Sequence, residues 1–297
     1  MAILIEHEVK PMPTEKEESH ITEAFGVRKC PKLVNQVRSA KRQVRVNALE
    51  VLCDELHNPM VVVGLIDAGV IPTLNKQVRT DADALTRERA SKALSIAAND
   101  ANGRRALLDA KTPSQILGAL DDAETKVRKN AYEALIRVSS ATLPAVHALI
   151  DAKYPATLVA KAANENVTLQ PLALRLLVQC LRDEVGLEEA LANNAVETCI
   201  TLLASFDTSV KREAASALGM LCFAEAAKVT AIKGGAVPQL VDLMRDREVS
   251  ERARGRRARS RRRSRSLSHP PPVPPRVRAR PPILHSSACA SPRSARS

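Results

Sequence analysis

Residues 65–78 read LIDAGVIPTLNKQV, and close variants of this stretch return twice further along the chain. Residues 107–120 read LLDAKTPSQILGAL and residues 149–162 read LIDAKYPATLVAKA, so an apolar pair, an aspartate and a proline keep their order at intervals of 41 or 42 residues. The aspartate position continues as Asn193, and the proline position is also filled by Pro31 and Pro238. A repeat that keeps its spacing over most of the chain indicates a stack of equivalent units.

A second set of positions keeps the same interval. Its members are leucines, each preceded four residues earlier by a small or apolar residue: Leu52, Leu94, Leu135, Leu176 and Leu218. Around them apolar residues recur at helical spacing, as in residues 127–138, which predicts an amphipathic helix. The 297 residues include two Tyr, three Phe and no Trp, so the core must be built from Ala, Leu, Val and Ile. Such a composition suits closely packed helices.

A unit of 41–42 residues that contains several helices is the period of armadillo and HEAT repeats. Each unit predicts a short helix, then a helix opened by proline (74–78, 116–120 and 158–162), then a longer helix after a polar break. Gly69 and the pair Gly234-Gly235 favour a left-handed end to the short helix, and Lys111 and Lys153 take that place in two middle units. The proline spacing and the single long helix favour armadillo over HEAT. The predicted fold class is therefore an all-α, armadillo-repeat superhelical solenoid with disordered termini.

These patterns divide the chain into three segments. Residues 1–23 carry no repeat and are expected to be extended or disordered. Residues 24–249 are predicted to hold about five full armadillo repeats and one incomplete repeat, and residues 250–297 to form an Arg/Ser/Pro-rich disordered tail. The sixth repeat opens at Pro238 but loses its apolar pattern soon after Val249. Its uncovered apolar helix face predicts either a partner at that end or poor solubility.

The net charge of +12 is unevenly distributed. Residues 252–297 hold 14 Arg and no acidic residue, which leaves 31 basic and 33 acidic residues in 1–251. Three interpretations of the tail remain open: an Arg/Ser segment that binds RNA or an import receptor, a solvated basic tail, or an end altered by a frame change or a retained intron. The tail has no aromatic residue for base stacking, which argues against nucleic acid. The loss of pattern within a helix favours the altered end.

Few residues of the sequence suggest a catalytic, metal or cofactor site. The six His form no HExxH or H-x₃-H pair and the six Cys form no C-x₂-C pair, so we predict no metal site and no cofactor. No glycine-rich phosphate loop is present. No apolar run approaches the roughly 18 residues of a membrane span, and the first residues do not resemble a signal peptide. We expect an intracellular, non-enzymatic protein with reduced cysteines, no small-molecule substrate and no membrane association.

The inner face of the stack is the remaining candidate site. In armadillo nuclear-import adaptors, Trp and Asn stand two residues before and after the leucine anchor, and this chain has neither residue there. Its later units hold the apolar residues Leu174, Val178 and Met220 at those positions. The first three units hold mainly charges: Glu50, Asp54, Lys92, Glu133 and Arg137. We predict that these five charged residues bind protein partners; the alternative is that they form a solvated face.

The first repeat also carries residues that are uncommon among armadillo repeats in general. They are Ala24-Phe25-Gly26, Pro31-Lys32-Leu33, Arg45, Ala48-Leu49, Leu52-Cys53-Asp54 and His57-Asn58-Pro59. With these residues the chain resembles the radial-spoke armadillo subunits of motile cilia. The resemblance implies a non-enzymatic scaffold or docking subunit in the axoneme of the cilium or flagellum, with other radial spoke subunits as partners, and a cytoplasmic protein before assembly. The alternative is a nuclear or cytoplasmic adaptor whose Arg/Ser tail binds RNA or an import receptor.

Overall fold

The computed structural model describes residues 26–245. They lie in a compact unit that ends at Val249, and a second unit, Ser250–Ser297, lies outside the described residues. The predictions for residues 1–23 and for the tail at 250–297 therefore also fall outside them. Within residues 26–245 the regular secondary structure is helical, without a strand, which confirms the all-α class.

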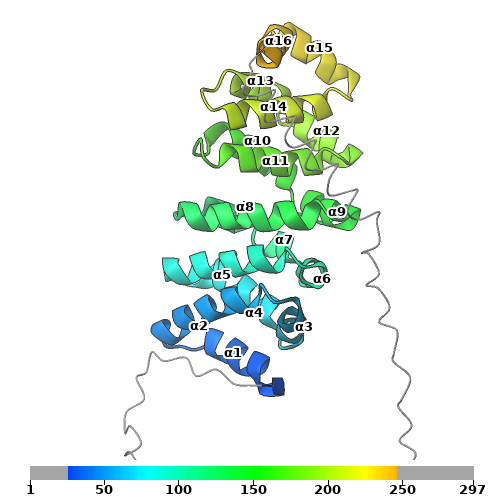
Figure 1. Ribbon diagram of the computed structural model, residues 1–297. Helices are drawn as coiled ribbons and strands as arrows, with labels where there is room; N and C mark the ends of the chain where they lie inside the picture. The colour runs from blue at the N-terminus through cyan, green and yellow to red at the C-terminus, as the bar shows by residue number, and fades with distance from the viewer. Residues whose placement is uncertain (1–25, 246–297) are drawn as a thin grey trace, which may run out of the picture. The chain divides into compact units, whose positions relative to one another are not determined.

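Three kinds of helix alternate along the chain (Figure 1). The short first helices are α3 (Pro59–Asp67), α6 (Ala101–Asp109), α9 (Leu143–Asp151), α12 (Glu184–Ala192) and α15 (Glu225–Lys233). The second helices are α1 (Lys29–Val37), α4 (Val70–Thr80), α7 (Thr112–Gln115), α10 (Tyr154–Asn164), α13 (Ala195–Leu203) and α16 (Ala236–Arg245). The third helices, most of them longer, are α2 (Arg42–Glu55), α5 (Ala84–Ala97), α8 (Thr125–Ser139), α11 (Gln170–Cys180) and α14 (Thr208–Leu221). Two 3₁₀ segments complete the described residues, η1 (Gly26–Arg28) and η2 (Leu117–Asp121).

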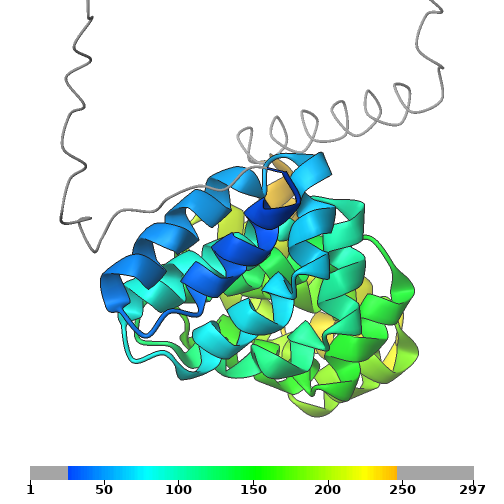
Figure 2. The ribbon, with the colours of Figure 1, turned by 90° about the horizontal axis from the view of Figure 1, so that it is seen from below.

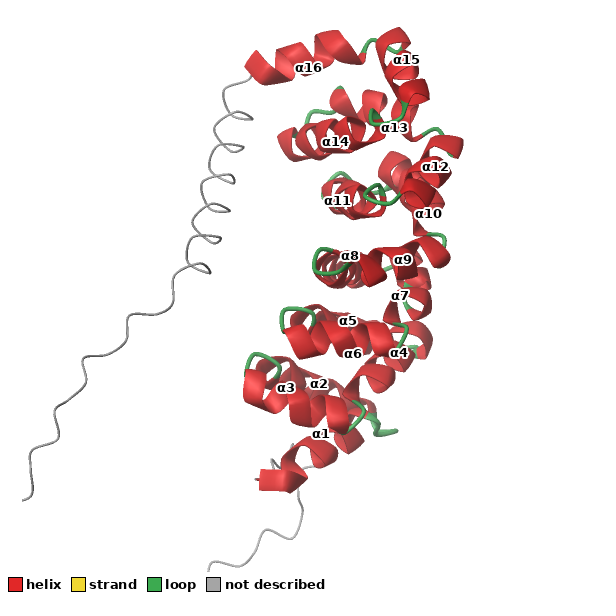
Figure 3. Ribbon diagram, turned by 90° about the vertical axis from the view of Figure 1, so that its right-hand side faces the viewer, coloured by secondary structure: helices red, strands yellow, loops and turns green. Residues whose placement is uncertain are grey.

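The helices of this unit stack into an arc. In Figure 3 the third helices lie along the inner side of the arc, and α4, α10 and α13 lie along its outer side. Each third helix packs against the next one, from α2 through α5, α8 and α11 to α14. Figure 2, a view along the stack, shows the blue N-terminal helices in front of the later repeats. The arrangement confirms the predicted solenoid.

The predicted leucine anchors form the centre of the core. Leu52, Leu94, Leu135, Leu176 and Leu218 are each 2% exposed or less. Full burial of such a side chain stabilises the fold by about 1.5–3 kcal/mol. Small residues four positions earlier in the third helices, such as Ala48 and Ala90, are also buried and let neighbouring helices approach closely.

The link between the first and second helices has the same left-handed backbone in every described repeat that contains it. Its residues are Gly69, Lys111, Lys153, Asn194 and Gly235, with φ between 51° and 78°. The left-handed ends predicted at Gly69, Lys111 and Lys153 are confirmed. Asn194 joins them, because its short polar side chain tolerates this conformation better than most.

The third unit differs from the prediction. A helix was expected over residues 116–120, but α7 is a single turn of four residues and η2 follows it as a 3₁₀ segment. The amide of Ala119 donates to the carbonyl of Ile116 at 2.9 Å, which is the tighter i→i+3 pattern. Gly118 lies in this segment, and glycine in a helix costs about 1 kcal/mol relative to alanine.

Candidate protein-binding surface

The five charged residues predicted to bind partners lie on three consecutive third helices. Glu50 and Asp54 are on α2, Lys92 is on α5, and Glu133 and Arg137 are on α8. These helices run side by side along the inner side of the arc (Figure 3). The first three residues are exposed and the last two are half-buried. The stack therefore gathers them over three adjacent repeats.

Glu50 is paired with the next repeat. Its Oε2 atom lies 3.1 Å from Nη1 of Arg89, and the same Nη1 donates to the carbonyl of Val46 at 2.7 Å. The Glu50 side chain is nevertheless 64% exposed. An ion pair this exposed contributes about 0–1 kcal/mol, so a partner can compete for the carboxylate.

Glu133 and Arg137 form a cluster that joins α8 to α5. Nη2 of Arg137 lies 3.0 Å from Oε2 of Glu133, one helical turn away. Nη1 of Arg137 donates to the carbonyl of Ser95 at 2.9 Å and also to the Ser95 hydroxyl. These two residues therefore hold neighbouring repeats together in addition to presenting charge.

Two of the five charged residues, Asp54 and Lys92, have exposed side chains without a bonded partner among the described residues. Within residues 26–245 neither side chain makes an ion pair or a hydrogen bond, and both are exposed. Cys53, beside Asp54, is buried instead, and burial raises the pKa of its thiol to about 11. Asp54 and Lys92 are thus the two of the five predicted residues whose charged groups are not bonded to another described residue.

One apolar residue assigned to the surface by its position lies in the core. Leu174 on α11 is fully buried, so the interpretation of it as a surface residue is wrong. The reason is that α11 packs against α8 and α14 on its two sides and against α10 as well. Val178 and Met220 are half-buried, so they leave part of an apolar surface on the later repeats.

A set of half-buried arginines, called here the arginine edge, was not predicted from the sequence. Each is the fourth residue of its third helix and forms an ion pair with an acidic residue in the loop one repeat later. The pairs are Arg45–Asp81 at 3.0 Å, Arg87–Asp122 at 2.7 Å and Arg128–Glu165 at 3.1 Å. The 41–42 residue spacing of the arginines was the signal that could have revealed them.

Arg87 shows what each arginine of this edge does. Nε and Nη2 donate to the two carboxylate oxygens of Asp122 at 2.7 and 3.1 Å, while Nη1 donates to the carbonyls of Asp81 and Ala82 at 3.0 and 3.1 Å. Burial alone would raise the pKa of Asp122, but its hydrogen bonds with Arg87 and with the amide of Glu124 lower that pKa below its usual value. Arg87 therefore holds the loop that precedes its own helix and links this loop to the corresponding loop of the next repeat.

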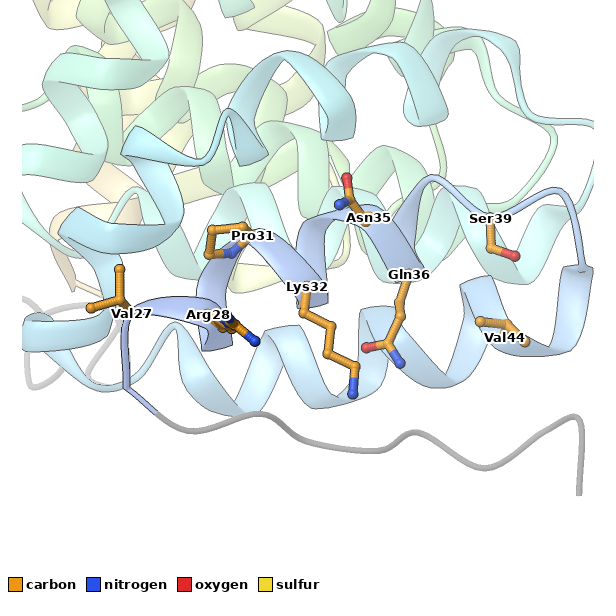
Figure 4. A pocket seen from close by; sticks show the side chains of 8 residues that line it. All are labelled: Val27, Arg28, Pro31, Lys32, Asn35, Gln36, Ser39 and Val44. Carbon is orange, nitrogen blue, oxygen red and sulfur yellow. The ribbon is translucent and has the colours of Figure 1, made fainter. Parts of the chain in front are cut away.

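A groove lies at the N-terminal end of the described residues. It has a volume of about 670 Å³ and is lined by Val27, Arg28, Pro31, Lys32, Asn35, Gln36, Ser39 and Val44 (Figure 4). Half of these residues belong to α1, Val27 and Arg28 belong to η1, and Val44 is on α2. Arg28 and Lys32 make the groove cationic. None of the residues predicted to bind partners lines it.

No group of three or more His, Cys, Asp or Glu within residues 26–245 is placed to hold a metal ion. Burial raises the pKa of Cys180 and of Cys199 to about 12, so both thiols are protonated and unreactive near neutral pH. No single described helix is long and apolar enough to cross a membrane; α3 and α4 meet that test only as a pair, across a bend of 77°.

Comparison with known proteins finds relatives among curated sequences. No protein-family model matches the chain. The chain is similar to radial spoke protein 14 of Chlamydomonas reinhardtii, at 28% identity over 251 residues, which cover 79% of this chain and 63% of the relative. The matched region thus spans less than two thirds of the relative's length. The predicted resemblance to radial-spoke subunits is confirmed.

Several solved structures with the same fold are designed or engineered proteins. A designed armadillo repeat protein, YIII(Dq)4CqI, has a TM-score of 0.67 at 22% identity, over 76% of this chain and 97% of that chain. A computationally designed armadillo repeat protein for modular peptide recognition has a TM-score of 0.68 at 22% identity, with the same coverage. An engineered protein has a TM-score of 0.67 at 26% identity, over 76% of this chain and 93% of that chain. The described residues therefore have the armadillo-repeat fold.

Proposed function

We propose that this chain is a non-enzymatic scaffold or docking subunit of the ciliary radial spoke. The observation that carries the proposal is the similarity to radial spoke protein 14, which extends over 79% of the chain and thus far beyond the first repeat. The proposed location is the axoneme of the cilium or flagellum, with a cytoplasmic stage before assembly. The proposed partners are other radial spoke subunits.

The proposed mechanism is the presentation of a rigid curved surface. Each third helix packs on the next, and the arginine edge ties successive loops together, so the repeats keep a fixed spacing. A partner that lies along the inner side would contact several repeats at once, which is how solenoid proteins generally bind. Asp54 and Lys92 are proposed as the first charges to be engaged, followed by Glu50 after release from Arg89. Glu133 and Arg137 are proposed to contribute with less freedom, because they also join α8 to α5.

Tagged chains expressed in ciliated cells test the proposal. The full chain and residues 1–251 are compared for retention in the axoneme and for co-extraction with spoke components as salt is raised. Retention of both forms with spoke components is expected. A nuclear or diffuse signal that reaches the cilium only when residues 252–297 are present would refute the scaffold and favour the adaptor with an Arg/Ser tail.

Charge reversal tests the inner surface separately. The double variant Asp54→Lys, Lys92→Glu should reduce incorporation into spokes, because both side chains are exposed and make no ion pair or hydrogen bond within the described residues. The matched control is Arg105→Glu, Asp109→Lys, which reverses an exposed pair on the short helix α6. Equal incorporation of the two double variants would remove the inner surface from the proposal.

A further inference from the structure

The groove beside α1 lies where a preceding repeat would pack. At an offset of 41 residues, Lys32 and Gln36 of α1 correspond to Thr73 and Gln77 of α4. Both of these later residues are buried, and the side-chain amide of Gln77 donates to the carbonyl of Val37 in the repeat before it. Lys32 is exposed and Gln36 is half-buried. The groove is therefore the open form of a junction that is filled one repeat later.

The lining of this groove is both apolar and cationic. Val27 is 96% exposed, and Pro31 is also exposed. Arg28 and Lys32 are exposed too, and neither side chain makes an ion pair or a hydrogen bond with another described residue. No acidic residue is among the described residues that line the groove. An occupant that matches this lining carries carboxylates together with apolar side chains.

The groove belongs to a stretch of the chain with charge of one sign. Residues 26–49 hold seven basic residues and no acidic residue. Three of the seven are paired with acidic residues further along the chain: Lys29–Glu55 at 2.7 Å, Arg42–Asp83 at 2.9 Å and Arg45–Asp81 at 3.0 Å. The described residues provide no such acid for Arg28 and Lys32. The positive potential at this end of the stack therefore favours an acidic occupant.

The segment that directly precedes the groove has the complementary charge. Residues 1–25 contain two basic and six acidic residues, which gives a net charge of 2 − 6 = −4. Residues 15–25 hold four of these acids and two large apolar residues: Glu15, Glu17, Glu18, Glu23, Ile21 and Phe25. The next residue, Gly26, has a left-handed φ of 63°, and Val27 after it already lines the groove. The segment thus matches the groove in chemistry and adjoins it in the chain.

The length of the segment also matches the groove. Figure 4 shows the groove running along α1, with Val27 at one end and Ser39 at the other. With nine residues, α1 is about 14 Å long. Five extended residues span about 17 Å, so residues 21–25 alone can run the length of this helix. Because the segment is tethered at Gly26, its effective concentration at the groove is on the order of 1 mM, and a Kd of about 0.1 mM keeps it docked about ten to one.

We propose that residues 15–25 of this chain turn back at Gly26 and lie in the groove, where they cover α1 and close the N-terminal end of the stack. Carboxylates of the segment neutralise Arg28 and Lys32, and its apolar side chains cover Val27. Solenoids generally need a cap on each terminal repeat, and this segment supplies one. The inference goes beyond the proposed ciliary role and does not depend on it.

Proteolysis of the full 297-residue chain tests the contact. Thermolysin cleaves before large apolar residues, and the bond between His20 and Ile21 lies within the segment. When docking is fast, the rate of cleavage follows the undocked fraction. Each rate, measured by mass spectrometry, is divided by that of a free peptide with the same sequence over residues 14–27. The parent chain should be cut about tenfold more slowly than its peptide.

Charge reversal in the groove should release the segment. In the double variant Arg28→Glu, Lys32→Glu, cleavage should rise to within about twofold of the peptide rate, because the groove then repels the carboxylates of the segment. Addition of Glu18→Lys and Glu23→Lys to this variant should restore slow cleavage, since the attraction is re-formed with the signs exchanged. Circular dichroism checks that each variant keeps the helical content of the parent chain.

The matched control is Lys76→Glu, Arg79→Glu, which reverses two exposed basic residues on α4 that do not line the groove, and it should leave the parent rate unchanged. Equal acceleration by this control would overturn the groove as the site. Cleavage of the parent chain at the peptide rate would refute docking and leave the groove to an acidic segment of another protein. Slow cleavage that survives Arg28→Glu, Lys32→Glu would place the segment elsewhere. Protection that is lost on dilution of the chain would assign the groove to the segment of a second copy.

Discussion

Replacement of Arg87 by lysine tests whether the arginine edge ties the repeats together by geometry or by charge alone. Lysine keeps the positive charge but loses the planar fork that contacts both oxygens of Asp122. Its single ammonium nitrogen replaces three guanidinium nitrogens, so it keeps about two of the four hydrogen bonds that Arg87 makes to Asp122, Asp81 and Ala82. The variant should therefore destabilise the fold although the net charge is unchanged.

The expected loss follows from burial and from the number of contacts. The Arg87 side chain is 18% exposed and that of Asp122 is 8% exposed, so the groups left without partners regain only part of their hydration. Loss of about two hydrogen bonds to charged or carbonyl groups under these conditions should lower the free energy of unfolding by about 2–3 kcal/mol. The control Arg105→Lys alters an ion pair of 3.9 Å on α6 whose side chains are 86% and 73% exposed, and it should change stability by less than about 0.5 kcal/mol.

Urea unfolding followed by far-ultraviolet circular dichroism measures both variants, because the chain has no tryptophan for fluorescence. A double-mutant cycle with Asp122→Asn isolates the coupling between the two side chains. The lowered pKa of Asp122 means that its contribution is present above the pKa of the unfolded carboxyl and is lost as pH falls through the folded value. Arg87→Lys should flatten this acid dependence. Equal stability losses for Arg87→Lys and Arg105→Lys would refute the reasoning.

Three further changes test local features of the fold. Gly103→Ala should destabilise by several kcal/mol in urea unfolding, because its Cβ would lie 2.0 Å from the last carbonyl oxygen of α5 and no relaxation of a side chain can relieve that overlap. Lys153→Gly should stabilise the chain by about 0.5–1 kcal/mol, measured as an increase in the urea midpoint, because glycine removes the cost of the left-handed backbone at φ 62°. In native buffer near neutral pH, Cys222 should react with a thiol reagent well before Cys180, as counted by mass spectrometry, because Cys180 is fully buried and its pKa is raised to about 12.

Each of these predictions has a control within the chain. Gly219→Ala adds a methyl group to the exposed side of α14 with no atom within 4 Å, and it should stabilise by up to about 1 kcal/mol. Lys129→Gly changes an exposed lysine within α8 and should destabilise by about 1 kcal/mol, opposite in sign to Lys153→Gly. In urea, Cys180 and Cys222 should react at similar rates. Destabilisation by Lys153→Gly, or rapid labelling of Cys180 in native buffer, would contradict the corresponding account.

The pattern of repeats allowed much of the fold to be predicted. The links at Lys111 and Lys153 were expected to replace glycine, and both have the left-handed backbone. These features are local, since the end of a helix depends on residues within one or two turns. The α-helix predicted over residues 116–120 does not form, and the reason is also local, because Gly118 weakens a helix there. The candidate surface was less predictable, because equivalent positions on successive helices differ in burial.

The amino-acid sequence by itself determined the period, the order of the three kinds of helix and the leucines of the core. Helical periodicity and turn chemistry act within a few residues, so a single chain displays them directly. The tertiary structure alone decided that Arg87 bonds to Asp122, 35 residues away. It also decided that Arg137 bonds to Ser95, whereas Lys92 makes no ion pair or hydrogen bond among the described residues. It also decided that Leu174 is buried and that Val241 is exposed. The physical reason is that these outcomes depend on which side of a helix the neighbouring repeat covers, and that is set by contacts about one repeat away in the sequence.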